Sequence, residues 1–185
     1  MSLPGNPPPE VIRGDAIRNQ TITPGPIVSA SDAMIVIQSP DDPERYFLVV
    51  QSNNHFRVYE IGDNNQFNLV SEIPKPAGFV SSSFTFHPSG KIAVAPRNAN
   101  QNVILLDFDG TTGEISFDRA IPNSGNDDGG PYAIYDVEFN EDGSIIYLSR
   151  TGSARQEGMI LQYDLNNPTD TLEPVNLGIT LFRSW

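Results

Sequence analysis

The sequence contains no cysteine, only one tryptophan and only 11 lysine and arginine residues in 185 positions. The absence of cysteine excludes disulfides, thiolate nucleophiles and cysteine metal ligands. Because 23 aspartate and glutamate residues give a formal net charge of −12, we expect neither a nucleic-acid partner nor binding to an anionic membrane surface. No run approaches 18 apolar residues, so membrane insertion is not predicted either.

Long amphipathic helices are also missing, because no stretch of ten or more residues shows helical periodicity. The 16 prolines and 15 glycines favour many short strands separated by turns. Three consecutive prolines, Pro7 to Pro9, predict an extended N-terminal segment over residues 1–26. That segment lacks the pattern of a signal peptide, which leaves two interpretations open: a cytosolic protein and a piece of an exported one.

Alternation of apolar and polar residues indicates the strands. Tyr46–Val50 is almost continuously apolar, as in a strand buried on both faces, and Phe56–Ile61 alternates. Asn53 and Asn54 lie between these two segments and fit a hairpin turn. The other predicted strands are Phe67–Ile73, Ser82–Phe86, Lys91–Ala95, Val103–Phe108, Glu114–Arg119, Ile134–Phe139, Ile145–Ser149, Met159–Tyr163 and Leu172–Leu177.

These strands recur as a repeated unit. Phe86–Gly90 aligns with Phe139–Gly143, and Leu105–Phe108 aligns with Leu161–Asp164 in a register that the sequence leaves open by one residue. A third copy spans Ala33–Ile73. Four short strands in roughly 40–50 residues are typical of a propeller blade, whose small sheet buries its faces only by stacking on its neighbours.

The predicted fold is therefore all-β: a partial β-propeller of about three four-stranded antiparallel blades. The repeat segment covers residues 27–185, with blades near residues 33–73, 82–121 and 133–178, and residues 179–185 are interpreted as the start of a further blade. Closed propellers need four to eight blades. Three alternatives follow: a fragment of a larger ring, a homo-oligomer formed through open blade faces, or a different packing such as a β-sandwich.

The order of the motifs resembles the WD40-like or lactonase-like β-propeller repeats of large exported proteins in gliding bacteria, which often carry type IX secretion sorting domains. The resemblance covers roughly residues 33–170. It departs from the family at Phe47, where tryptophan is common, and at His87-Pro88-Ser89-Gly90, which replaces Ser-Pro-Asp-Gly. It implies a propeller in a secreted or cell-surface context, and no catalytic residue carries over from it. The matching stretches are Tyr46–Val50, His55–Ile61, Pro88–Ala95, Ile104–Ser116, Pro131–Ser149 and Ile160–Leu165.

One local motif points to an enzyme. Val103–Thr111 is a hydrophobic strand followed by Asp-x-Asp-Gly-Thr, as in the first motif of haloacid-dehalogenase phosphatases, in which Asp107 would be the nucleophile and Asp109 the acid and base. That chemistry needs a downstream lysine, and no lysine follows Lys91. The favoured interpretation is a strand that leads into a tight hairpin, with side-chain oxygens bonded to turn amides.

Several acidic turns are candidate calcium-binding sites. The candidates are Asp107 with Asp109, Asn126–Gly130 and Asn140–Gly143. Counted from Asp107, an EF-hand loop would place Thr112 where glycine is needed and Asp118 where glutamate is needed. Charged turns are usually only solvated, so we predict no metal or cofactor and keep calcium as a weak alternative.

The two histidines, His55 and His87, lie at turns and show no metal-binding spacing. We interpret them as turn or surface residues. No Gly-x-Ser-x-Gly elbow is present, so no catalytic residue is assigned. A group of aromatic residues alternates along the strands and is expected in the core between blades: Phe84, Phe86, Tyr135, Phe139 and Tyr147.

Three functional hypotheses result. The first is a non-catalytic propeller segment that serves as a structural module or binds a protein, glycan or other ligand, within a larger exported protein. The second is a lactonase-like hydrolase with a metal or acidic site. The third is a cytosolic β-domain that associates with itself.

Overall fold

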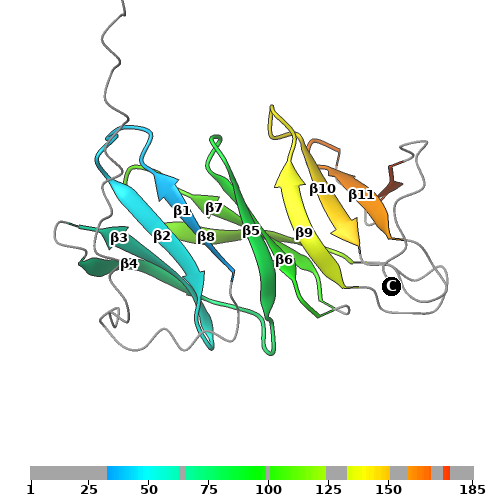
Figure 1. The fold of residues 1–185 in the computed structure, drawn as a ribbon, viewed down its shortest axis with the longest axis horizontal. Coiled ribbons are helices and arrows are strands. Elements are labelled where there is room, and N and C mark those ends of the chain that lie inside the picture. The colour runs from blue at the N-terminus through cyan, green and yellow to red at the C-terminus, as the bar shows by residue number, and fades with distance from the viewer. Residues whose placement is uncertain are drawn as a thin grey trace, which may run out of the picture.

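The computed structural model describes residues 33–62, 66–98, 101–123, 133–150, 158–167 and 173–175. These residues form three four-stranded antiparallel sheets, which lie side by side (Figure 1). Blade 1 consists of β1 (Met34–Gln38), β2 (Tyr46–Gln51), β3 (His55–Ile61) and β4 (Phe67–Pro74). Blade 2 consists of β5 (Ser81–His87), β6 (Lys91–Pro96), β7 (Val103–Phe108) and β8 (Ile115–Ile121). Blade 3 consists of β9 (Ile134–Phe139), β10 (Ile145–Arg150), β11 (Met159–Asp164) and β12 (Glu173–Pro174).

The predicted strands are confirmed, most of them to within a residue or two. Val103–Phe108 and Ile134–Phe139 have the predicted bounds. The strand predicted at Glu114–Arg119 starts one residue later and ends at Ile121. The predicted segment 1–26, the acidic turn at 126–130, half of the predicted strand at 172–177 and residues 179–185 lie outside the described residues.

Two similar turns support the repeat. The amide of Gly90 donates to the carbonyl of His87 at 2.9 Å, and the amide of Gly143 donates to that of Asn140 at 3.1 Å. Both glycines have positive φ, +85° and +71°, a region that glycine enters without a steric penalty. The predicted alignment of Phe86–Gly90 with Phe139–Gly143 is therefore confirmed.

The second alignment, whose register the sequence leaves open by one residue, ends in two similar turns. The Asp109 carboxylate accepts hydrogen bonds from the amides of Thr111 and Thr112, and the Asp164 carboxylate accepts them from Asn166 and Asn167. In the ladders, Leu106 pairs with Ile92 and Tyr163 pairs with Ile146. The turns and the ladders thus relate the two strands at different registers, each one residue away from the alignment of Phe108 with Asp164.

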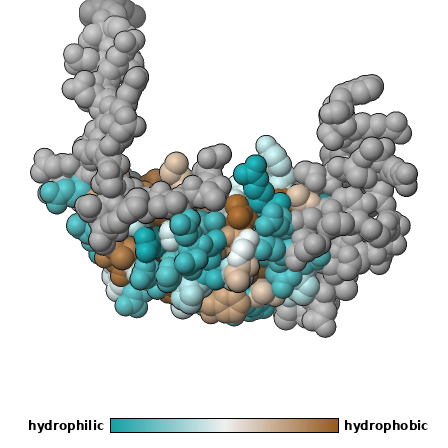
Figure 2. All heavy atoms as spheres, turned by 90° about the horizontal axis from the view of Figure 1, so that it is seen from below, coloured by the Kyte–Doolittle hydropathy of each residue, from teal (hydrophilic) through white to brown (hydrophobic). Residues whose placement is uncertain are grey.

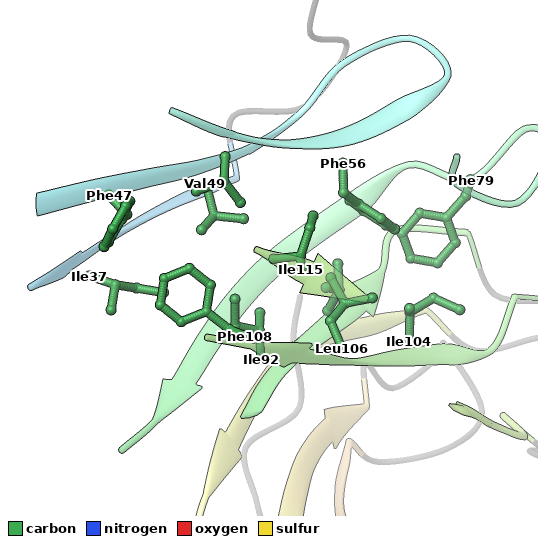
Figure 3. Packing of buried hydrophobic residues seen from close by; sticks show 12 residues of the cluster. Ile37, Phe47, Val49, Phe56, Phe79, Ile92, Ile104, Leu106, Phe108 and Ile115 are labelled. Atoms are coloured by element: carbon green, nitrogen blue, oxygen red, sulfur yellow. The ribbon is translucent and has the colours of Figure 1, made fainter. Parts of the chain in front are cut away.

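Two hydrophobic clusters hold the blades together. Between blades 1 and 2 the cluster is rich in phenylalanine, including Phe47 and Phe108 (Figure 3), whose rings pack edge to face. Phe86 also packs edge to face on Phe108. Between blades 2 and 3 it contains Ala93 and Ala95 of β6 opposite larger side chains such as Leu148. Both faces of blade 2 are therefore buried, as expected for an inner blade.

Blade 1 is apolar on both faces at β3. Val58 and Tyr59 are both buried, although they are neighbours in sequence. Successive side chains of a strand point to opposite faces, and Val58 lies in the cluster between blades 1 and 2 while Tyr59 packs with Leu48 and Val50. The pairing of β3 with β4 shifts by one residue between these two positions.

Within the described ranges no helix is long and apolar enough to cross a membrane. On the face of the molecule drawn in Figure 2, the described side chains are mainly hydrophilic, with hydrophobic residues in smaller patches.

Candidate functional site

A cavity of about 580 Å³ lies where blade 2 meets blade 3. It is formed by the first residues of the neighbouring strands β5 and β9, together with the residue that follows β6. Its lining combines polar and apolar residues: Ser81, Ser82, Ser83, Arg97, Ala133, Ile134, Tyr135 and Asp136.

The local sequence explains why β5 opens a space here. Three consecutive serines begin the strand, and its pairing with β6 is irregular between Ser81 and Ser83. The Ser82 hydroxyl lies 3.0 Å from the carbonyl oxygen of Ile134, so it links the two blades. The Ser83 hydroxyl is buried and has no hydrogen-bond partner among the described residues. An unpaired buried hydroxyl costs free energy unless a ligand or water satisfies it.

Opposite charges meet at this cavity. Arg97 is exposed and makes no ion pair with a described residue, and its backbone amide is held by the carbonyl of Val80 at 2.7 Å. Asp136 is also exposed, and its carboxylate accepts a hydrogen bond from the amide of Val137. The pocket can therefore offer a cation, a carboxylate and hydroxyl groups to one small molecule.

Tyr135 corrects the sequence analysis. It was expected in the core between blades, yet 73% of its surface is exposed, and it lines the cavity. Tyr147 also lies outside the three hydrophobic clusters that the described residues form. Phe84, Phe86 and Phe139 do lie in the core, as predicted. The alternation of a strand identifies its two faces and not which of them is covered.

The residues of the phosphatase-like motif are arranged differently. Asp107 lies on β7, where the ammonium of Lys91 binds it at 2.5 Å and also binds Asp118 at 2.8 Å. Burial acts to raise the pKa of Asp118, but hydrogen bonds from Lys91 and Arg119 outweigh it, so this pKa is lowered. Sequence reasoning missed this cluster, because Lys91 precedes the motif and reaches it only across the sheet.

Asp109 follows β7 and forms the tight turn that was the favoured interpretation. Hydrogen bonds from Thr111 and Thr112 lower the pKa of its exposed carboxyl group. Asp142 is similar, with its pKa lowered by hydrogen bonds from Ser144. In the described ranges no three acidic or histidine side chains gather as metal ligands would.

The two histidines occupy turns, as predicted. His55 begins β3, and its carbonyl oxygen accepts the amide of Ser52 in the hairpin turn. His87 ends β5, and its Nε2 lies 3.1 Å from the carbonyl oxygen of Glu141 in the next blade. The His87 ring packs on Phe139 with the ring centres 5.6 Å apart. His87 therefore joins two blades, and it does not line the cavity.

Comparison with known proteins gives the wider context. No family model matches the chain. An uncharacterized protein of Lactococcus lactis subsp. cremoris is 22% identical over 138 residues, which are 75% of this chain and 40% of that protein. The chain thus spans well under half of this relative.

Solved structures show the same fold. A putative 6-phosphogluconolactonase from Bacteroides uniformis matches with a TM-score of 0.52 and 18% identity, over 75% of this chain and 38% of that one. The Dos1 propeller matches with a TM-score of 0.52 and 19% identity, over 74% and 34%. The chain is a β-propeller segment of three blades, which confirms the predicted fold class and, for the fold, the resemblance to lactonase-like propellers.

Proposed function

We propose that this chain is a non-catalytic propeller segment that binds a small polyhydroxylated acid, such as a sugar acid, in the cavity between blades 2 and 3. The observation that carries the proposal is the composition of the cavity lining. Arg97 suits a carboxylate, because a guanidinium can donate two parallel hydrogen bonds to it. Asp136 suits the hydroxyl groups of the ligand, because a carboxylate accepts hydrogen bonds from them.

Tyr135 adds an apolar surface to these polar groups. Its exposed ring can lie against the carbon skeleton of a sugar while its hydroxyl stays in water. The similarity in fold to a protein described as a putative 6-phosphogluconolactonase supports ligands of this class. The exported or cell-surface context that the sequence resemblance implies belongs to the same proposal.

The choice of binding over hydrolysis rests on the lining. Among the described residues that form the cavity there is no histidine, and Asp136 is the sole carboxylate. A lactonase-like reaction needs a general base positioned against a water molecule, and Asp136 would have to supply it without a second acid. The hydrolase is therefore our second candidate function.

Calorimetric titration with D-gluconate tests the proposal. We expect saturable binding by the full chain and at least a tenfold loss of affinity in Arg97→Ala, because the carboxylate loses its counter-charge. Arg119→Ala, which removes an arginine on β8 outside the cavity, is the matched control and should bind as the unaltered chain does.

The same samples test the hydrolase. Opening of glucono-1,5-lactone should proceed at its spontaneous rate with or without the protein. Acceleration that Asp136→Asn abolishes would replace the binding proposal with the hydrolase. No heat of binding and no acceleration would contradict both.

A further inference from the structure

A buried glutamine occupies an apolar position in blade 1. Along β2, Phe47, Val49 and Gln51 share one face, because side chains two residues apart in a strand point the same way. Phe47 and Val49 belong to the cluster between blades 1 and 2, whereas Gln51 is polar and yet only 1% exposed. A buried side-chain amide costs free energy unless it is hydrogen-bonded. Its two ends therefore need polar partners.

Both ends of the Gln51 amide find these partners at the start of blade 2. The backbone amide of Ser81 donates to Oε1 at 2.6 Å, and Nε2 donates to the carbonyl of Phe79 at 3.3 Å. The ammonium of Lys75 donates to the same carbonyl. A backbone N–H only donates and a carbonyl only accepts, so the two backbone partners fix the orientation of the side-chain amide. Gln51 thus holds the chain on either side of Val80.

The segment held in this way leads to two walls of the cavity. Ser81 begins β5 and is itself a lining residue. The carbonyl of Val80 accepts the backbone amide of Arg97 at 2.7 Å, and Arg97 is the arginine of the lining. Hydrogen bonds therefore connect Gln51 with the serine wall of the cavity and with the backbone of its arginine.

The strand ladder alone holds this wall weakly. Ser81 lies opposite Pro96, which has no N–H to donate, and the pairing of β5 with β6 is irregular within its first three residues. The end of a strand without a regular ladder opens readily. By contrast, the Phe79 ring is buried and packs edge to face on Phe56, with the ring centres 5.7 Å apart (Figure 3). Gln51 extends this anchorage in blade 1 to the wall of the cavity.

We propose that Gln51 is a positioning residue for the cavity, through which blade 1 sets the places of Ser81 and Arg97. The inference rests on the proposed function for the nature of the ligand, but its hydrogen bonds lie within the chain. Gln51 does not line the cavity. It acts on affinity because the backbone of Arg97 must lie where the guanidinium reaches the carboxylate of the ligand.

Gln51→Met tests the proposal, because methionine fills a similar buried volume without the amide. In calorimetric titration with D-gluconate we expect an affinity about five- to tenfold weaker than that of the unaltered chain, the effect of about one lost hydrogen bond. Gln38→Met is the matched control. Gln38 is exposed on β1 of the same blade and donates to the carbonyl of Pro43 at 2.7 Å, outside the cavity lining, so its loss should leave the affinity unchanged.

Equal affinity of the Gln51→Met chain and the unaltered chain would overturn the positioning role and leave the binding proposal intact. If the unaltered chain binds no gluconate, the proposed function itself fails, and amide hydrogen exchange without ligand then decides the role of Gln51.

Exchange at the Arg97 amide is the readout that a purely stabilising role would not move selectively. Gln51 does not contact this amide, so positioning predicts that Gln51→Met lowers its protection more than that of the β7 amides in the same sample. An equal loss of protection in all strands would assign Gln51 to general stability and overturn the proposal.

Gln51→Glu is the second variant, for use if the Gln51→Met chain does not fold. Its carboxylate still accepts the amide of Ser81 but no longer donates to the carbonyl of Phe79. We expect weaker binding of gluconate and lower protection of the Arg97 amide than in the unaltered chain. Unchanged affinity together with unchanged exchange at Arg97 would overturn the proposal.

Discussion

The two interfaces between blades both bury apolar sheet faces, but they do so with different side chains. Blades 1 and 2 meet through large aromatic rings, with Phe108 in edge-to-face contact with Phe47 and Phe86. Blades 2 and 3 meet where Ala93 and Ala95 leave room for larger residues. At the second interface polar side chains also cross directly, as Thr85 does to Glu138 at 2.9 Å.

This difference explains where the cavity lies. Phenylalanine rings pack among aliphatic side chains in the space between blades 1 and 2 (Figure 3). Between blades 2 and 3, small side chains bring the inner strands β5 and β9 together, and serines rather than apolar residues begin β5. The interface between blades 1 and 2 is therefore rich in rings, and the interface between blades 2 and 3 contains the cavity.

The largest effect should come from the aromatic interface. Phe108→Ala removes a buried ring that touches two others, and we expect a loss of about 3–5 kcal/mol in the free energy of unfolding. Urea titration followed by circular dichroism measures it. Leu148→Ala in the other interface is the comparison, and a larger loss there would invert the contrast between the two interfaces.

Gly113 connects a turn to the same aromatic core. It has φ of +79°, and a Cβ atom here would lie 2.5 Å from the ring of Phe47. Gly113→Ala should therefore lower the free energy of unfolding, measured by urea titration, by about 1–3 kcal/mol, because it strains the backbone and displaces the Phe47 ring. Gly78→Ala is the control for positive φ alone, because Gly78 has φ of +71° and open space around it. Equal losses in the two variants would show that contact with Phe47 contributes nothing.

The alanine interface should resist added volume. Ala93 is fully buried between blades 2 and 3, so Ala93→Val should destabilise the chain by about 1–2 kcal/mol through overpacking. The same urea titration measures the loss. A neutral result would mean that this interface is loosely packed, and the explanation given for the cavity would then fail.

The smallest effect should come from the charged cluster around Lys91. Burial alone would lower the pKa of Lys91, but Asp107 and Asp118 raise it, and the pKa of Asp118 is lowered in return. A lowered carboxyl pKa contributes stability above its unfolded-state value and loses it as the pH falls through the folded-state value. A raised lysine pKa contributes stability below the unfolded-state value and loses it as the pH rises through the folded-state value.

Both contributions are present at pH 7. Lys91→Met should therefore lower the free energy of unfolding at this pH by up to about 1 kcal/mol, the usual contribution of a partly exposed ion pair. The cost should shrink toward pH 2, where the carboxyl groups are protonated. Unfolding curves of both chains at pH 7 and pH 2 provide the measurement. A cost that does not change with pH would assign the effect to packing of the lysine stem.

The sequence by itself determined the strands and the turns. Alternation at Val103–Phe108 and Ile134–Phe139, and glycine at positions 90 and 143, are local signals that need no partner to be recognised. They were sufficient for the fold class and for the turn at Asp109. They were insufficient for the register of Leu105–Phe108 against Leu161–Asp164, because neighbouring apolar residues in a strand differ only in the face they take.

Only the tertiary structure decided which faces meet. Tyr135 and Phe139 belong to one strand, yet the first lines a cavity and the second lies in the core. The pairing of Lys91 with Asp107 and Asp118 depends in the same way on contacts between distant segments. The physical reason is that a strand pattern fixes two faces, while hydrogen-bond register and sheet packing determine what each face touches.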